Sequence, residues 1–229
     1  MASANITFEH VEKPDENLAE EATQVFAGLM VDDPAAIALV GGDMNLLPSL
    51  GAMMIRALAL TPGVADVFTA RDEDGALVGY AIFSLPGHLI LSTPEQQKHG
   101  LFDFMGRLSP EGQKYYPEVM AKEVPKANDE AFGIQEAERN TYWCNFAMVR
   151  ADFQGKGIAR ALFELATKEA AKTGATMALT TTNIRNVPIY EKLGFKLYGH
   201  KVIPSPWVDW PLWFFAKETK ADSTAAEAA

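Results

Sequence analysis

The residue types best suited to chemistry form a turn at residues 154–159, whose sequence is QGKGIA. An apolar run at 146–149 ends just before this turn, and apolar residues recur at helical spacing from Ile158 onward. The glycines therefore lie where a strand leads into a helix. The first N–H groups of a helix have no partner within it, and the helix dipole adds partial positive charge there. Because glycine lets the backbone approach a ligand closely, the pattern predicts a phosphate or pyrophosphate site.

Two common phosphate motifs do not fit this turn. A P-loop requires Lys followed by Ser or Thr at its second glycine, whereas Gly157 is followed by Ile158. A dinucleotide fingerprint that begins at Gly155 requires a third Gly or Ala where this chain has Arg160. Glycine-rich turns also serve as plain strand-to-helix connections, so the turn alone does not identify its ligand.

Two motifs follow one another along the second half of the chain. In the first, Gln154, Gly157 and Ala159 fill the pattern Gln/Arg-x-x-Gly-x-Gly/Ala. In the second, Asn183 ends a β-rich run and the helical segment at 190–195 reads YEKLGF. In this order and on these elements, the motifs resemble the signatures of the GCN5-related N-acetyltransferase (GNAT) family.

The resemblance covers residues 141–203, and the first half of the chain is similar to the family in general layout. The stretches 153–157 and 185–195 also resemble the puromycin-acetyltransferase type within the family. The implied fold is α/β (α+β), a mixed, mostly antiparallel sheet of about seven strands flanked by helices. Its central parallel pair, implied here at 141–149 and 176–182, splays apart.

The resemblance also implies how such a site works. Acetyl-CoA would lie between the splayed strands, with its pyrophosphate on the glycine turn and no metal ion. Tyr190 would give a proton to the leaving thiolate, although it could equally be a half-buried packing residue. A phenol has a reference pKa near 10, so it is protonated at neutral pH and suits a general acid. The implied cofactor contacts are Met148, Val149, Gln154, Gly155, Lys156, Gly157, Ile158, Ala159, Arg160, Asn183 and Asn186.

The group that deprotonates the acceptor is not fixed by the motifs. Some family members use a Glu on the cofactor strand, but this chain has Trp143 at that place, with Asn145 nearby. Glu138, Asp209 and His88 are alternative bases. An acceptor with a lowered pKa needs no strong base.

A long segment at 86–140 is an insertion for this fold, with helices expected at 94–108 and 111–122. Its aromatic residues predict packing on the domain, and we expect it to cover the acceptor site. Trp207 and Trp210 lie in a Pro-rich hairpin loop, where they either line an apolar pocket or cap the core. We expect an apolar acceptor pocket between the insertion and this loop. The predicted substrate contacts are Trp143, Asn145, Trp207 and Trp210.

Hydrophobic periodicity and turn residues predict the remaining elements. Strands are expected at 6–11, 64–71, 76–85, 196–203 and 211–217, and helices at 14–29, 48–60 and 186–193 and from residue 158 onward.

Composition sets further expectations. The 229 residues, 48% of them hydrophobic, predict one domain at 1–219 followed by a flexible tail at 220–229. A net charge of −10 argues against nucleic-acid binding and is compatible with a cationic acceptor. Cys144 is the single cysteine, so no internal disulfide forms, and its apolar strand predicts a buried thiol.

No signal peptide or membrane-spanning apolar run is evident in the sequence. We expect a cytoplasmic monomer or homodimer that does not bind membranes. The function implied is acetyl transfer from acetyl-CoA to a primary amine of a small, partly hydrophobic molecule. Two alternatives are a non-catalytic acyl-CoA-binding or regulatory protein, and an acyltransferase that acts on a protein amine.

Overall fold

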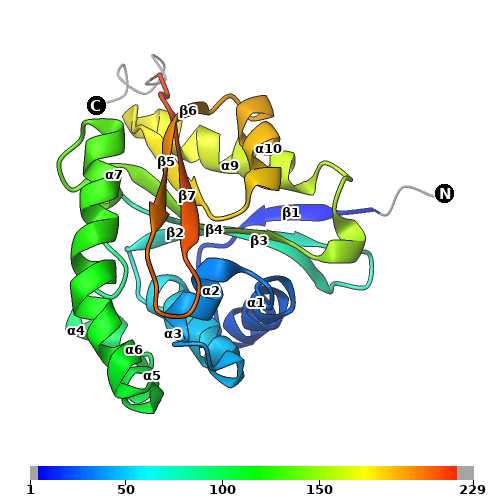
Figure 1. Ribbon diagram of the computed structural model, residues 1–229. Helices are drawn as coiled ribbons and strands as arrows, with labels where there is room; N and C mark the ends of the chain where they lie inside the picture. Colours follow the sequence, from blue (N-terminus) through cyan, green and yellow to red (C-terminus); the bar gives the residue numbers. More distant parts are fainter. Residues whose placement is uncertain (1–4, 221–229) are drawn as a thin grey trace.

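The computed structural model describes residues 5–220, which are built around one seven-stranded sheet (Figure 1). The strands are β1 (Thr7–His10), β2 (Ala65–Arg71), β3 (Leu77–Ser84), β4 (Tyr142–Val149), β5 (Met177–Thr181), β6 (Lys196–Ile203) and β7 (Trp210–Lys217). They lie in the order β1-β2-β3-β4-β5-β7-β6. Only β4 and β5 are parallel among the neighbours in this sheet of the described residues. The sheet is therefore mixed and mostly antiparallel, as the sequence predicted.

The parallel strands β4 and β5 pair over a short stretch. Tyr142 lies opposite Met177 and Trp143 lies opposite Ala178. β4 then continues to Val149 with no further pairing to β5 in the described part of the chain. The strands thus separate toward their carboxyl ends, and the backbone of β4 lacks a sheet partner on that side. This confirms the splayed parallel pair.

A β-bulge marks the point on β4 where the strands separate. Phe83 of β3 lies opposite Cys144, whereas Ile82 lies opposite Phe146. Asn145 is therefore the extra residue of the bulge. Because a bulge bends its strand and changes the direction of side chains, it helps β4 to turn away from β5.

Helices cover both faces of the sheet (Figure 1). They are α1 (Glu16–Leu29), α2 (Pro34–Leu39), α3 (Leu47–Ala59), α9 (Ile158–Thr173) and α10 (Val187–Lys192). The apolar stripe of α1, which includes Leu18 and Phe26, packs on one face together with α3. Phe163 of α9 and Tyr190 of α10 pack on the opposite face. The opening between β4 and β5 is therefore bordered by different helices on its two faces.

The insertion at 86–140 is helical, but its helices differ from the prediction. Gly100 has φ +116° and divides the expected helix at 94–108 into two. The next helical rod does not end at residue 122 as predicted, since it continues to Phe132. The elements are α4 (Pro94–Gln97), α5 (Leu101–Arg107), α6 (Pro110–Tyr115), the π-helical η2 (Tyr116–Glu123), α7 (Val124–Phe132) and α8 (Ala137–Asn140).

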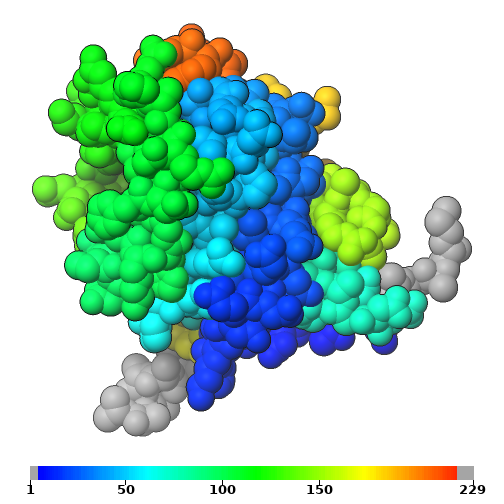
Figure 2. Space-filling model, turned by 90° about the horizontal axis from the view of Figure 1, so that it is seen from below, coloured from blue at the N-terminus to red at the C-terminus, as the bar shows by residue number. Residues whose placement is uncertain are grey.

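The insertion packs along the N-terminal helices rather than standing apart from them. Phe104 and Leu108 are buried in the same core cluster as residues of α1 and α3. Figure 2 shows the insertion in green beside the blue helices, with the orange β6–β7 loop at the junction of the two. Three segments far apart in sequence therefore meet on this side of the sheet.

Two terminal stretches, residues 1–4 and 221–229, lie outside the described residues, and the predicted tail falls almost entirely in the second. From residue 5 to residue 220, no helix combines the length and the apolar character needed to cross a membrane.

Candidate active site

The glycine turn opens onto free space at the start of α9. Gly155 and Gly157 have φ values of +75° and +81°, in the left-handed region that favours glycine. A Cβ at either position would meet no atom within 4 Å. No side chain of the described residues caps the first N–H groups of this 16-residue helix. The turn can therefore receive an anion at the helix N-terminus.

Cationic side chains stand beside this turn. Lys156 Nζ lies 4.2 Å and Arg150 Cζ lies 4.9 Å from the centre of the Phe153 ring. The Gln154 Nε2 donates to the carbonyl oxygen of Val149 at 3.0 Å, which ties the end of β4 to the turn. Of the other predicted cofactor contacts on these elements, Met148 and Ala159 are half-buried, Ile158 is buried and Arg160 is exposed.

Tyr190 points into the core on the α9 side of the sheet. Its ring packs against Phe163 at 5.8 Å and Phe215 at 5.4 Å between centres, and the residue is 9% exposed. Burial raises the pKa of Tyr190 above its ordinary value, and the neighbouring Cys144 thiol raises it further. The hydroxyl is therefore protonated at neutral pH. The thiol itself is buried, as predicted, and burial raises its pKa as well.

The two asparagines after β5 have different roles in the structure. Asn183 is exposed and its Oδ1 accepts from the N–H of Arg185 at 3.0 Å, which caps the short helix η4 (Ile184–Asn186). Asn186 Nδ2 donates to Thr181 Oγ1 at 3.0 Å. Asn183 thus stands at the open end of β5, and Asn186 fastens the start of α10 to the same strand end.

A carboxylate that the sequence analysis did not single out reaches the end of β5 from the other face. Thr182 Oγ1 donates to Asp33 Oδ2 at 2.5 Å, and both residues are half-buried. The other oxygen, Oδ1, accepts from the N–H groups of Ala35 and Ala36 and caps α2. The sequence-based predictions include no helix at 34–39, although an Asp N-cap followed by Pro is typical of a helix start. No sequence signal predicts the contact with Thr182.

Trp143 and Asn145 occupy the base of the opening between β4 and β5. Trp143 is 6% exposed and packs edge-on against Phe132 of the insertion, with ring centres 6.1 Å apart. The insertion thus covers the indole, and the contact of Trp143 with a substrate stays a prediction. Asn145 Nδ2 donates to Ser84 Oγ at 2.6 Å, so the bulge residue presents a polar group where the strands separate.

The expected pocket between the insertion and the β6–β7 loop is filled by side chains. Trp210 is 3% exposed, and its Nε1 donates to the Tyr115 hydroxyl at 2.8 Å. Trp207 is half-buried and packs edge-on against the same tyrosine at 5.6 Å. The insertion and this loop are therefore in direct contact. The prediction that Trp210 lines an open pocket between them is wrong, because its indole is part of the core.

The three alternative bases are placed differently. Glu138 bonds to Asn128 within the insertion at 2.6 Å. Asp209 Oδ1 accepts from the N–H of Ser205, so it shapes the β6–β7 loop. The N–H of His88 donates to the carbonyl oxygen of Leu85 in the turn after β3. None of these bonds connects to the ends of β4 or β5.

Replacing Tyr115 with Phe tests whether its hydroxyl fastens the insertion. The hydroxyl accepts from Trp210 and donates to the carbonyl oxygen of Pro204 at 3.2 Å. Its loss leaves the buried Trp210 Nε1 unpaired and removes the bond to Pro204, so we expect the free energy of unfolding to fall by about 1–3 kcal/mol. Denaturant unfolding measures this change. Tyr198→Phe, at an exposed tyrosine of β6, is the control, and equal stability of the two variants would contradict the assignment.

Comparison with known proteins agrees with this architecture. Residues 93–204 match the family described as "Acetyltransferase (GNAT) domain". No curated protein matches the sequence. The match begins inside the insertion and includes the glycine turn, Asn183 and Tyr190.

Solved structures share the fold at low sequence identity. An arylalkylamine N-acetyltransferase 2 from Aedes aegypti has 17% identity and a TM-score of 0.60, over 93% of this chain and 99% of that one. A histone acetyltransferase HPA2 and related acetyltransferase from Corynebacterium glutamicum has 16% identity and a TM-score of 0.61, over 96% and 99%. The putative acetyltransferase yncA from Salmonella typhimurium, solved with its cofactor acetyl-CoA, has 16% identity and a TM-score of 0.51, over 96% and 97%. Residues 93–204 thus match a GNAT acetyltransferase domain, and the chain shares its fold with solved acetyltransferases.

Proposed function

We propose that this enzyme transfers an acetyl group from acetyl-CoA to a primary amine of a small, partly hydrophobic molecule. The observation that carries the proposal is the opening between β4 and β5. The glycine turn and Tyr190 lie on one face of this opening, and the Asp33 carboxylate lies on the other. A donor and an acceptor can thus approach the same gap from opposite faces.

The residues around the gap fit acetyl-CoA, whose thioester supplies an activated acetyl group. The open space over Gly155 and Gly157 and the free N–H groups of α9 suit its pyrophosphate. The backbone of β4 after Trp143 has no partner toward β5, so its N–H and C=O groups can bind an extended amide chain. The side-chain Nδ2 of Asn183 has no partner at the end of β5, since Oδ1 is the side-chain atom that is engaged in the described structure.

Tyr190 is the proposed general acid. A thiolate that leaves needs a proton, and a buried phenol with a raised pKa holds one at every physiological pH. Its ring is held by Phe163 and Phe215, so the hydroxyl has a fixed position. The sequence motif and the placement of α10 beside the end of β5 both support this role.

Asp33 is the proposed group that binds the acceptor and takes its proton. An amine must lose a proton before it attacks, and a carboxylate both attracts the ammonium form and accepts that proton. Thr182 and the N-terminus of α2 hold the carboxylate in one orientation at the end of β5. This assignment replaces Glu138, Asp209 and His88, whose bonds lie elsewhere.

The class of acceptor follows from the surroundings of Asp33. Val31, two residues before Asp33 in the loop between α1 and α2, is 52% exposed and adds apolar surface to that loop. The Aedes aegypti protein of the same fold carries an arylalkylamine acceptor in its name, a class that joins an amine to an apolar group. Both points favour an amine with a hydrophobic substituent.

A panel of acceptors tests the proposal directly. CoA release is measured with arylalkylamines, simple alkylamines, polyamines, and peptides with a free N-terminus or lysine. The proposal expects the highest kcat/KM with an amine that carries an apolar group. A preference for peptides would assign a protein amine as acceptor. Acetyl-CoA binding without CoA release for any acceptor would favour the non-catalytic alternative.

Replacing Gly157 with Leu is expected to weaken acetyl-CoA binding at least tenfold, or about 1.4 kcal/mol. The new side chain enters the open space above the turn and blocks the approach of the pyrophosphate. Isothermal titration calorimetry measures the affinity. The matched control is Gly63→Leu, because Gly63 also has a left-handed φ of +76° and free space around it, far from the site. Unchanged affinity in a folded Gly157 variant would refute the placement.

A further inference from the structure

An amide and a carboxyl group face each other where α7 meets α8. Asn128 of α7 is 1% exposed, and its Nδ2 donates to Glu138 Oε1 of α8 at 2.6 Å. The Oδ1 of Asn128 is buried and has no hydrogen-bond partner in the described residues. A buried acceptor without a partner destabilises a fold, so this atom needs a donor.

A protonated carboxyl group supplies that donor. It has one O–H donor and one carbonyl acceptor, which is the complement of a primary amide. Glu138 in this form accepts from Nδ2 through Oε1 and donates from its second oxygen to Oδ1 of Asn128. Burial is the main cause that raises the pKa of Glu138 to about 7; the bond from Asn128 opposes the rise and the Asp129 carboxylate adds to it. The neutral form is thus populated at physiological pH.

We propose that Asn128 and Glu138 form a proton-dependent latch, which joins α7 to α8 through two hydrogen bonds when Glu138 is protonated and weakens when it is ionised. The latch is independent of the acceptor chemistry proposed above.

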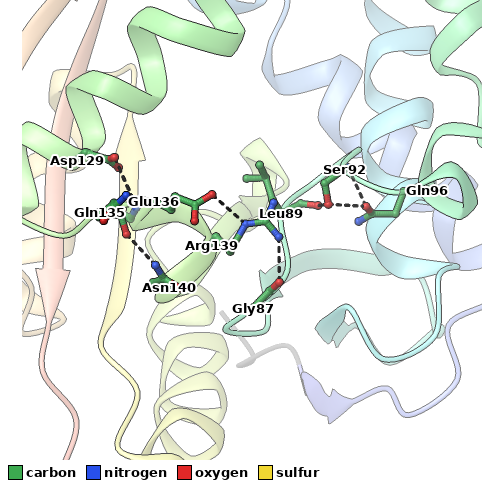
Figure 3. Close-up of polar contacts among 10 residues, drawn as sticks. Gly87, Leu89, Ser92, Gln96, Asp129, Gln135, Glu136, Arg139 and Asn140 are labelled. Carbon is green, nitrogen blue, oxygen red and sulfur yellow. Dashed lines mark hydrogen bonds and ion pairs between the residues drawn. The ribbon is translucent and has the colours of Figure 1, made fainter.

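Among residues 5–220, the charged group that acts on Glu138 is the Asp129 carboxylate, and no cation compensates an ionised Glu138. Asp129 accepts from the N–H groups of Glu136 and Ala137 at 3.0 and 2.9 Å, so its carboxylate stays at the start of α8 (Figure 3). Arg139 is engaged with Glu136 and with the carbonyl oxygen of Gly87. β4, the strand next to α8, has no charged residue. An ionised Glu138 therefore faces a second carboxylate and the lone pairs of Asn128.

The latch affects the candidate active site through α7. Phe132 at the end of α7 packs edge-on against Trp143 of β4 and Phe214 of β7, with centres about 6 Å apart in both pairs. Trp143 lies at the last paired position before β4 and β5 separate. Opening of the latch therefore loosens the contact between the insertion and the closed end of the gap.

Hydrogen exchange at α7 and α8 tests the latch. After correction for intrinsic exchange rates, we expect protection of the wild-type amides at 128–140 to fall by up to tenfold per pH unit between about pH 4.5 and about pH 7, and to level off above this window. Glu138→Gln keeps a donor and an acceptor at every pH, so its protection is expected to stay constant. Glu130→Gln removes the same charge from the exposed side of α7 and is expected to behave like the wild type.

The pH dependence of stability gives a second measurement. Because the pKa of Glu138 is higher in the folded state than its ordinary value of 4.5, its contribution to stability is full below about pH 4.5 and is lost as the pH rises to about 7. The Tm of Glu138→Gln relative to wild type should therefore rise across this window and stay level above it. A Tm difference independent of pH, or equal loss of protection in wild type and Glu138→Gln, would overturn the proposal.

Discussion

The Tyr190→Phe variant is expected to lose turnover by roughly 100-fold to 10,000-fold, the usual effect of removing a positioned acid. The aromatic ring remains, so its packing on Phe163 and Phe215 and the affinity for acetyl-CoA should be unchanged. Steady-state kinetics with the best acceptor and calorimetry with acetyl-CoA separate the two quantities. Because burial raises the pKa of this phenol, its ionisation should not lower activity at any pH below about 10.

The control for this variant is Tyr142→Phe. Tyr142 is also a buried tyrosine, but its hydroxyl donates to Asp66 Oδ2 at 2.6 Å near the paired end of β4. Its loss is expected to reduce stability without a comparable loss of turnover in the folded protein. A Tyr190→Phe enzyme with the wild-type rate would leave Tyr190 as a packing residue and remove the proposed acid.

The Asp33→Asn variant is expected to lower kcat/KM for the amine by roughly 100-fold. An amide neither attracts an ammonium group nor accepts its proton, whereas Asn still caps α2 and bonds to Thr182. The loss should become smaller at high pH, where more of the free amine is already deprotonated. Steady-state kinetics over a range of pH measures both effects.

Asp32→Asn is the matched control, because the exposed neighbour carries the same charge and has no bond to β5. It should retain most of the activity. An Asp33→Asn enzyme with a full rate, or with a deficit that is the same at every pH, would show that the carboxylate does not take the proton.

The parts of the site that the sequence predicts are those formed by neighbouring residues. The glycine turn at 154–159 and the segment around Tyr190 are defined by local backbone requirements, which appear directly as residue types. The splayed pair follows from the resemblance, since no spacing rule shows that two parallel strands separate after two residues.

The sequence-based predictions that the structure contradicts concern contacts between distant segments. An aromatic residue in a loop is compatible with a pocket wall and with a core position, and only the approach of Tyr115 decides that Trp210 is buried. The break at Gly100 and the long rod that ends at Phe132 depend on packing against α3 and β7, which overrides local periodicity. Asp33 was missed for the same reason, because its partner lies in another part of the chain.

The hydrogen bond between Asp33 and Thr182 joins residues 149 positions apart. Contacts between such distant residues form slowly, because a long chain must close before they contribute any energy. During synthesis, which proceeds from the N-terminus, α2 is complete well before β5 leaves the ribosome. The hydrogen bond between Asp33 and Thr182 can therefore form only after β5 has been synthesised. The acceptor side of the gap is among the last features of this fold to form, so the nascent enzyme acquires its activity only after most of the chain has been made.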